Sequence, residues 1–302
     1  MIRNTQKQIE RIYFNWRINL IPEKNILFFG DPRGGTTWMG ETLSELFKLP
    51  ILWEPMLVRK DSRFAKFNFA SRQYLDENYE NEQINNSFLN LLKGKGIDHW
   101  EIKHTNTKEL RKSKAAIIKF TRGSMLLPYI TKQFSFEKKP IYMIRNPFAV
   151  VASQLKHPGW KNADSHFEIP TGIYNEVYDI HAEFLKTLQT KEEVLTAEWA
   201  LSNKVVLNHS RHNKDWIFIT YEQTLINPKQ TLIKILAEWN CSNLKLDKLD
   251  FNRKSRTSLS KKITPVNVQL EHWKSSFTSL QIQKMQDVLN YFEIDYNYLS
   301  NK

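Results

Sequence analysis

Two groups of cationic and hydroxyl side chains in this sequence are spaced as phosphate-binding groups would be. The first follows an apolar run at residues 26–29 and contains Arg33, two glycines and two threonines. The second begins with Arg145, directly after another apolar run, and Ser153 follows eight residues later. Guanidinium groups, hydroxyls and the free amides at the start of a helix all bind phosphate oxygens. The sequence therefore predicts an anion cradle at the first group and a place for a second phosphate at the other.

The first group resembles the P-loop pattern G-x-x-x-x-G-K-[ST], with one departure. Gly30 and Gly35 have the required spacing, but Thr36 stands where a P-loop has its phosphate-binding lysine. A kinase or ATPase uses that lysine together with a strand-ending aspartate that holds magnesium, and the other apolar runs do not end in an aspartate. We therefore expect phosphate to be held by backbone amides, threonine hydroxyls and Arg33, without a metal ion. Taken alone, the loop could also be an ordinary glycine turn.

Together the two groups resemble the motifs of the sulfotransferases that use 3′-phosphoadenosine 5′-phosphosulfate (PAPS). Residues 32–38 (PRGGTTW) resemble the family's loop for the 5′-phosphosulfate, P-[KR]-S-G-T-T-W, with a glycine in place of the serine. Arg145 with the following Asn-Pro and Ser153 resembles the family's 3′-phosphate motif and has the same spacing. The resemblance implies PAPS as sulfuryl donor, 3′,5′-ADP as product and no metal. The donor-binding residues that it implies are Arg33, Gly34, Gly35, Thr36, Thr37, Trp38, Arg145, Ser153 and Arg256.

Trp38 and Arg256 are the two members of this set with alternative explanations. Trp38 is expected to stack near the adenine or to pack under the loop. Arg256 lies in the cationic segment 250–264, and a basic loop near the C-terminus reaches over the 3′-phosphate in the family. Lys254 is the alternative candidate for that contact, and a solvated run of charges is the alternative explanation of the segment.

Further similarities favour the carbohydrate O-sulfotransferases over the cytosolic phenol and steroid enzymes. They are residues 52–55 (LWEP), 118–122 (IKFTR), 221–222 (YE) and 227–228 (NP). The resemblance covers about residues 25–298 and is weak between 59 and 114, where we expect the acceptor to be chosen. It implies in-line sulfuryl transfer to a hydroxyl, expected on a carbohydrate, with a lipid or small-molecule hydroxyl as the alternative acceptor.

Glu54 is the residue that we expect to take the proton of the acceptor. It stands where a strand should end at the carboxyl edge of the sheet, and transfer to a hydroxyl needs a base. The histidine that the cytosolic enzymes carry after their third strand is missing, because Lys119 is followed by Phe and Thr. Arg33 and Lys119 are expected to neutralise charge on the leaving oxygen. A purely structural ion pair of Glu54 with Arg33 or Lys119 is the alternative.

A parallel sheet is needed to bring these residues together. Its strands are predicted by apolar runs at 26–29, 50–56, 115–120, 141–144 and 216–220. After the first run, apolar residues recur at helical spacing as far as Phe47, which predicts a helix there. A further helix is expected over 224–239. We expect one α/β domain over 1–302, with a P-loop-like parallel sheet of four or five strands, helices on both faces and a helical insertion after the second strand at 59–114. An amphipathic helix is expected at 1–22.

Composition limits the location and the partners of the protein. No run approaches the roughly 18 apolar residues of a membrane span, the N-terminus lacks a signal peptide's apolar core, and the single cysteine excludes an internal disulfide. We expect a soluble, cytoplasmic, bacterial protein whose basic N-terminal helix docks on the sheet or touches a membrane surface. The net charge of +12 suits an anionic donor, and no nucleic-acid-binding signature accompanies it. A P-loop kinase or NTPase and a non-catalytic PAPS- or glycan-binding protein are the competing functions.

Overall fold

A central sheet of five parallel strands organises the computed structural model, which describes residues 18–57, 62–172, 174–253, 255–256 and 265–296. The strands are β1 (Ile26–Gly30), β2 (Ile51–Trp53), β3 (Ile117–Phe120), β4 (Ile141–Ile144) and β5 (Ile217–Thr220), in the spatial order β2-β3-β1-β4-β5. Every neighbouring pair in this sheet is parallel, which confirms the predicted fold class. Because the strands run in one direction, the loops that follow them meet at one edge of the sheet.

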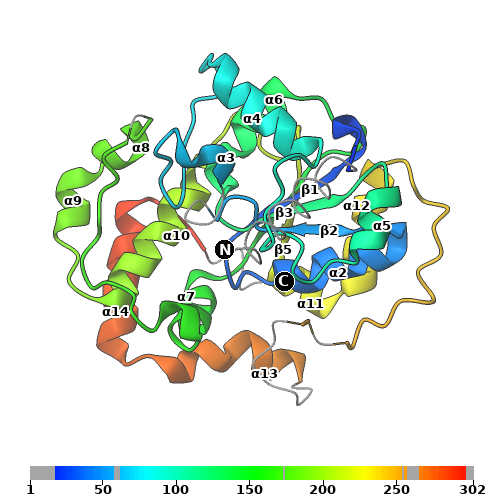
Figure 1. Ribbon diagram of the computed structural model, residues 1–302. Coiled ribbons are helices and arrows are strands. Elements are labelled where there is room, and N and C mark those ends of the chain that lie inside the picture. The colour runs from blue at the N-terminus through cyan, green and yellow to red at the C-terminus, as the bar shows by residue number, and fades with distance from the viewer. Residues whose placement is uncertain (1–17, 58–61, 173, 254, 257–264, 297–302) are drawn as a thin grey trace, which may run out of the picture.

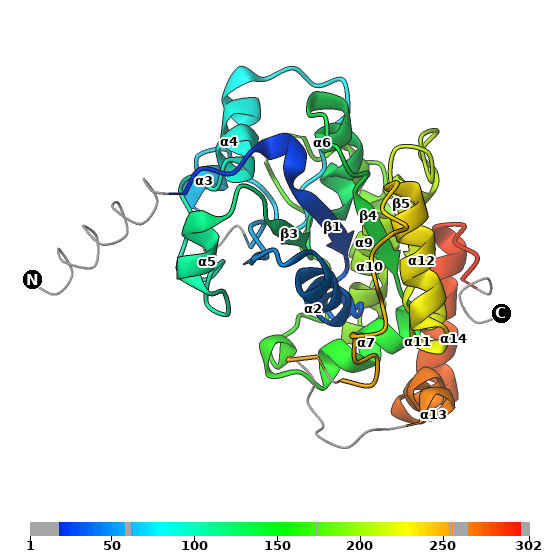
Figure 2. The same ribbon diagram turned by 90° about the vertical axis from the view of Figure 1, so that its right-hand side faces the viewer.

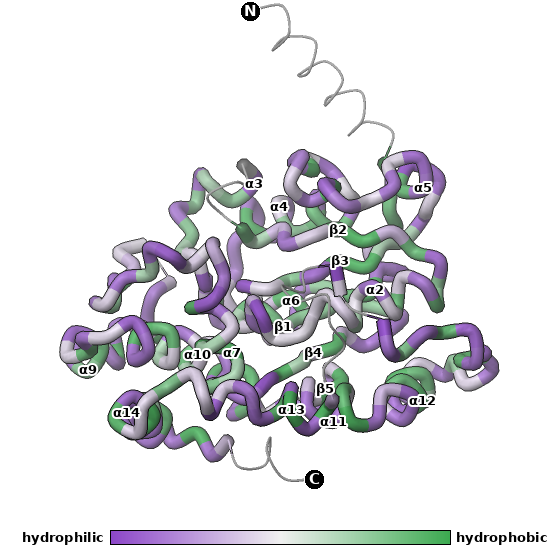
Figure 3. The backbone as a smooth tube through the Cα atoms, turned by 90° about the horizontal axis from the view of Figure 1, so that it is seen from below, coloured by the Kyte–Doolittle hydropathy of each residue, from purple (hydrophilic) through white to green (hydrophobic). Residues whose placement is uncertain are grey.

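The sheet has a hydrophobic core on each face. The first four strands are buried along their whole length, which explains why their sequences are apolar rather than alternating, apart from Lys119 in β3. In β1, Leu27 and Phe29 contribute to one core while Ile26 and Phe28 contribute to the other. The tube coloured by hydropathy shows β4 as a hydrophobic stretch in the middle of the molecule (Figure 3).

Helices cover both faces, as the sequence predicted. The helices α2 (Thr36–Phe47) and α12 (Pro228–Glu238) pack on the face of Phe28. The opposite core is filled from α6 (Leu127–Gln133), α7 (Pro147–Leu155), α10 (Lys191–Leu207) and α14 (Ser279–Tyr291). Figure 1 shows the first pair on one side of the strands and α7, α10 and α14 on the other.

A helical insertion separates β2 from β3, also as predicted. It contains α3 (Ser62–Ala65), α4 (Glu82–Leu92) and α5 (Thr107–Lys112), which lie along one flank of the molecule (Figure 2). Its aromatic residues Phe64, Phe69 and Phe88 are buried and contact one another. These rings are therefore part of the core rather than platforms exposed to a ligand.

Two helices replace the single helix that the sequence predicted over 224–239. The first, α11 (Tyr221–Ile226), ends before Asn227, whose ψ of 64° is not helical. The second, α12, begins at Pro228. Proline disfavours helical geometry in the residue before it and suits the first position of a new helix, so the helix is interrupted at this point.

The remaining elements are short. They are η1 (Pro22–Lys24), η2 (Ser124–Leu126), η3 (Pro158–Trp160), α8 (Glu176–Asp179), α9 (Ala182–Lys186), α13 (Val266–Glu271) and η4 (His272–Ser276), where η denotes a 3-10 helix. The N-terminal helix expected at 1–22 falls mostly on residues 1–17, which lie outside the described part of the chain. Among the helices of the described residues, none combines the length and the hydropathy needed to cross a membrane.

Candidate active site

Residues 31–35 form the turn between β1 and α2, which we call the donor loop. The turn is tight, because the amide of Gly34 donates a hydrogen bond to the carbonyl oxygen of Asp31 at 2.9 Å. Gly35 has a φ of 88° and lies against Tyr221, so that a Cβ there would come within 2.1 Å of the tyrosine ring. Only glycine fits this position. The N-cap residue Gly35 has no side chain to cap α2, so the first amides of the helix can bind an anion.

The second predicted phosphate motif joins β4 to α7. The side chain of Asn146 caps α7, because its Oδ1 accepts a hydrogen bond from the backbone amide of Ala149 at 3.2 Å. The backbone amide of Asn146 donates to the carboxylate of Glu222 at 2.9 Å. Pro147 occupies the first helical position, where its missing N–H costs nothing. This local structure fixes Arg145 at the strand end, next to the donor loop.

The structure brings the two motifs into direct contact. Arg33 Nε donates a hydrogen bond to Ser153 Oγ at 3.0 Å, and Arg145 Nη1 donates to the carbonyl oxygen of Arg33 at 2.9 Å. The guanidinium of Arg145 also lies over the ring of Tyr221, 4.2 Å from its centroid, and its Nε is buried without a hydrogen-bond partner among the described residues. Burial lowers the pKa of Arg33, and the neighbouring charge of Arg145 lowers it further. Two guanidinium groups and an unused buried donor in one place fit a polyanionic ligand.

Lys119 supplies a buried ammonium group at the start of α2. It extends from β3 on the face covered by α2 and is only 2% exposed. Its Nζ lies 3.4 Å from Thr36 Oγ1, 3.3 Å from Thr37 Oγ1 and 3.3 Å from Glu54 Oε1. Burial lowers the pKa of Lys119, and the carboxylate of Glu54 opposes that shift. The ammonium group thus lies beside Thr36, the residue that replaces the lysine of a P-loop.

Glu54 follows β2 directly and lies beside the same cluster. Its amide donates to the carbonyl oxygen of Lys119 at 2.9 Å, and Arg122 Nη1 approaches its Oε2 at 3.8 Å. The residue has a φ of 50°, a left-handed conformation that is unusual outside glycine. Its side chain makes the ion pair with Lys119 that a structural role requires, and it is 25% exposed to solvent.

Trp38 and Arg256 lie on the outer side of α2. The indole N–H of Trp38 donates to the carbonyl oxygen of Arg253 at 3.0 Å, so the ring packs against the segment that carries the basic residues. Arg256 donates to the carbonyl oxygen of His104 at 3.0 Å and pairs with Glu41 at 3.6 Å. These contacts do not bring Arg256 to Arg145 or Ser153. Its alternative, Lys254, lies outside the described residues.

The structure contains a buried ionic network beneath the donor loop that the sequence did not predict. Asp31 is 2% exposed and accepts hydrogen bonds from Arg72 Nη1 at 2.5 Å and from Asn203 Nδ2 at 2.7 Å. Arg72 also donates to Ser202 Oγ at 2.9 Å. The only signal in the sequence is an aspartate directly after a fully buried strand, where a charge needs a partner. The network ties the donor loop to the insertion and to α10.

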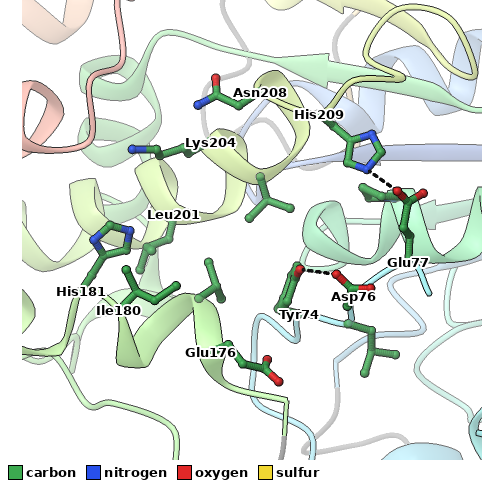
Figure 4. A pocket seen from close by; sticks show the side chains of 14 residues that line it. Tyr74, Asp76, Glu77, Glu176, Ile180, His181, Leu201, Lys204, Asn208 and His209 are labelled. Atoms are coloured by element: carbon green, nitrogen blue, oxygen red, sulfur yellow. Dashed lines mark hydrogen bonds and ion pairs between the residues drawn. The ribbon is translucent and has the colours of Figure 1, made fainter. Parts of the chain in front are cut away.

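The described part of the chain contains two cavities. One, of about 370 Å³, is enclosed by α8, α10 and residues 74–77, and its wall includes the contact between His209 and Glu77 (Figure 4). The other, of about 560 Å³, lies between α2, β2 and α5 and is lined by Arg256 and Trp53 among others. The donor loop lines neither cavity. Within the described ranges, no three His, Cys, Asp or Glu side chains are grouped to hold a metal ion.

Comparisons with known proteins identify the family. The family model described as "Sulfotransferase domain" matches residues 23–293. Three similar solved structures are the sulfotransferase domain from the curacin biosynthetic pathway (15% identity, TM-score 0.45, covering 90% of this chain and 98% of that one), mouse sulfotransferase SULT7A1 complexed with PAP (14%, 0.46, 95% and 91%), and the sulfotransferase domain from the Synechococcus PCC 7002 olefin synthase (17%, 0.45, 90% and 96%).

No curated protein matches the chain. The family match nevertheless spans both phosphate motifs, Glu54 and Lys119. It confirms the prediction made from the two motifs, and the chain belongs to the sulfotransferase family.

Proposed function

We propose that the protein transfers a sulfuryl group from PAPS to a carbohydrate hydroxyl by in-line displacement. The observation that carries this proposal is the hydrogen bond between Arg33 Nε and Ser153 Oγ at 3.0 Å, which joins the donor loop to the second phosphate motif. A donor with phosphate groups on both its 5′ and its 3′ side needs two such motifs in one site. ATP has no 3′-phosphate and would leave Arg145 and Ser153 without a ligand.

The donor would be held by groups that already face one another. The amides at the start of α2, with Arg33, bind the 5′-phosphosulfate. Arg145 and Ser153 bind the 3′-phosphate, and the buried Nε of Arg145 gains the hydrogen-bond partner that it lacks without ligand. Trp38, already packed against the segment at Arg253, borders the adenine.

In the chemical step one S–O bond forms, another breaks, and one proton is transferred. The acceptor oxygen attacks sulfur, the S–O bond to the 5′-phosphate breaks, and the proton of the acceptor passes to Glu54. The electron pair of the broken bond stays on the phosphate of 3′,5′-ADP. Lys119 and Arg33 stabilise that negative charge. Preorganised donors of this kind are each worth roughly 3 to 4 kcal/mol of barrier when water is excluded.

Lys119 connects the two ends of this step. Its Nζ is 3.3 Å from Glu54 Oε1 and also contacts the threonine hydroxyls that border the donor. An ammonium group in this place attracts the negative charge that builds on the leaving oxygen, and it holds the carboxylate that receives the proton. The ion pair between Glu54 and Lys119, which a purely structural role would also produce, is therefore compatible with catalysis.

Calorimetric titration tests the donor site. We expect micromolar binding of 3′,5′-ADP without metal, about −8 kcal/mol, and much weaker binding of 5′-AMP and of ATP with magnesium. Arg145→Ala should weaken 3′,5′-ADP far more than 5′-AMP, because only the former carries the 3′-phosphate. Tight ATP binding that depends on magnesium would instead support a kinase or NTPase.

Transfer of labelled sulfate from PAPS tests the enzyme and its acceptor. Oligosaccharides, 4-nitrophenol and a hydroxylated lipid are compared, and we expect the oligosaccharides to be the best acceptors. Glu54→Gln should leave 3′,5′-ADP affinity within about twofold and reduce transfer at least ~100-fold. Undiminished transfer by this variant would exclude Glu54 as the base, and binding without any transfer by the wild type would indicate a non-catalytic protein.

A further inference from the structure

His157 stands next to the proposed reaction centre, although it belongs to neither phosphate motif. It follows α7 and begins the 3-10 helix η3. Ser153, one turn earlier, contacts Arg33. His157 follows Ser153 by four residues but lies past the end of α7, with an extended backbone (φ −92°, ψ 133°), so the contacts of its ring rather than helical spacing decide where it lies.

Contacts through Trp160 and Arg122 connect His157 with Glu54, on the acceptor side of the site. The imidazole meets the ring of Trp160 edge to face, with centroids 5.4 Å apart. The guanidinium of Arg122 lies 5.8 Å from the centroid of the same indole and 3.8 Å from Glu54 Oε2. Burial lowers the pKa of His157, the charge of Arg33 lowers it further, and the charge of Glu54 raises it. The charges of Arg33 on the donor side and of Glu54 on the acceptor side thus both act on the ring.

The hydrogen bond of His157 to its own loop decides which nitrogen carries the proton. Nδ1 accepts the amide N–H of Gly159 at 3.0 Å. In a neutral imidazole one nitrogen accepts and the other donates, so the proton is on Nε2. A Cβ at position 159 would lie 3.0 Å from Nδ1, so glycine permits this close approach. A ring in this tautomer offers an N–H donor and is not poised to accept a proton at Nε2.

We propose that His157 is a further catalytic residue, whose Nε2–H donates a hydrogen bond to a non-bridging oxygen of the sulfuryl group during transfer. This inference rests on the proposed sulfuryl transfer. His157 gains and loses no proton in the step: the acceptor's proton goes to Glu54, and the broken S–O bond leaves its electrons on 3′,5′-ADP. The hydrogen bond keeps sulfur in line between the attacking and the leaving oxygens, and alignment of reacting atoms is a large part of catalysis.

Two substitutions separate a hydrogen-bond donor from a base. His157→Gln keeps an N–H group near the position of Nε2, while His157→Leu removes it. With labelled PAPS and the best acceptor, or with water as acceptor, we expect His157→Leu to lower kcat ~100-fold, as loss of one preorganised donor does. His157→Gln should stay within about fivefold of the wild type. Both variants should bind 3′,5′-ADP within twofold of the wild type, and His166→Leu, at an exposed histidine, is the matched control.

The pH profile completes the test. We expect kcat of the wild type and of His157→Gln to depend on pH in the same way, because the imidazole transfers no proton. If His157→Gln were as slow as His157→Leu and also lacked a titration that the wild type shows, His157 would be the base. Full activity of His157→Leu, or a large loss of 3′,5′-ADP affinity in both variants, would equally overturn the proposal. Absence of transfer by the wild type would refute the sulfuryl-transfer function itself, and the role of His157 with it.

Discussion

Replacing Arg72 by methionine should destabilise the protein by about 3 kcal/mol. Arg72 and Asp31 form an ion pair with Nη1 and Oδ1 2.5 Å apart, and their side chains are only 8% and 2% exposed. Methionine keeps most of the aliphatic length of arginine, so little packing is lost. The carboxylate of Asp31, in contrast, would stay buried with Asn203 Nδ2 at 2.7 Å as its remaining side-chain partner.

The magnitude follows from the burial of that charge. Removing one partner of a buried ion pair costs about 3 to 5 kcal/mol, because the other charge is left without compensation. The hydrogen bond from Asn203 softens the loss, which places the expectation at the lower end of that range. Glu198 also loses a contact with Arg72 at 3.5 Å, but its side chain is 35% exposed, so water replaces the guanidinium at little cost.

Urea unfolding followed by tryptophan fluorescence would measure the effect. The double variant Asp31→Asn with Arg72→Met should recover most of the lost stability, because an amide needs no counter-charge and can still bond to Asn203. The matched control is Lys139→Met, which breaks an ion pair of 2.9 Å with Glu238 whose side chains are 44% and 43% exposed. It should cost no more than about 1 kcal/mol. A loss below 1 kcal/mol in Arg72→Met, or a double variant no more stable than Arg72→Met, would refute this account.

Three further predictions concern the donor site. Gly35→Ala should weaken 3′,5′-ADP binding more than tenfold by calorimetry, because its Cβ would meet the ring of Tyr221 at 2.1 Å and the φ of 88° strains any L-residue; unchanged binding would contradict this geometry. Lys119→Met should lower the rate of transfer at least ~100-fold. In the wild type the rate of transfer should fall as pH rises through the pKa of Lys119, which burial lowers below the ordinary value of 10.5. The reason is that only the ammonium form stabilises the leaving phosphate. If the pH profile of Lys119→Met retained this decline, the decline would belong to another group. Trp38→Phe should cost about 1 kcal/mol of unfolding free energy in urea titrations, since it removes the 3.0 Å hydrogen bond to Arg253, and no loss would show that this bond is not stabilising.

The sequence predicted the sheet and its motifs because both depend on local features. A strand buried on two faces must be apolar throughout, and the turn at Gly35 needs a left-handed residue, so β1 and the donor loop are recognisable from neighbouring residues. The strand ends then place Glu54, Lys119 and Arg145 at one edge without any knowledge of their contacts. The single helix expected over 224–239 is helical on both sides of a break at Asn227, which the sequence analysis missed although Pro228 marks it.

Pairings between distant side chains could not be predicted in the same way. Arg72 and Asp31 are 41 residues apart, and nothing in the surrounding sequence indicates that they meet. His157 likewise belongs to a loop whose neighbours become known only when α7 is placed on the sheet. The position of Arg256 against Glu41 depends on the path of an irregular segment, for which periodicity carries no information. The roles of Glu54 and the donor-binding residues remain predictions.

The ammonium group that lies beside Thr36, at the lysine position of the P-loop pattern, comes from another strand. Lys119 and Thr36 are 83 residues apart in the chain, and they meet only when β1 and β3 pair in register, with Phe28 opposite Lys119. This ammonium charge therefore does not exist in a locally folded strand-turn-helix unit, whose own cation is Arg33. It appears when the long-range part of the sheet closes, so the ability to bind the donor and the completion of folding become one cooperative event. A slip of one residue in that pairing would turn Lys119 to the opposite face and leave the donor loop intact but without its ammonium group.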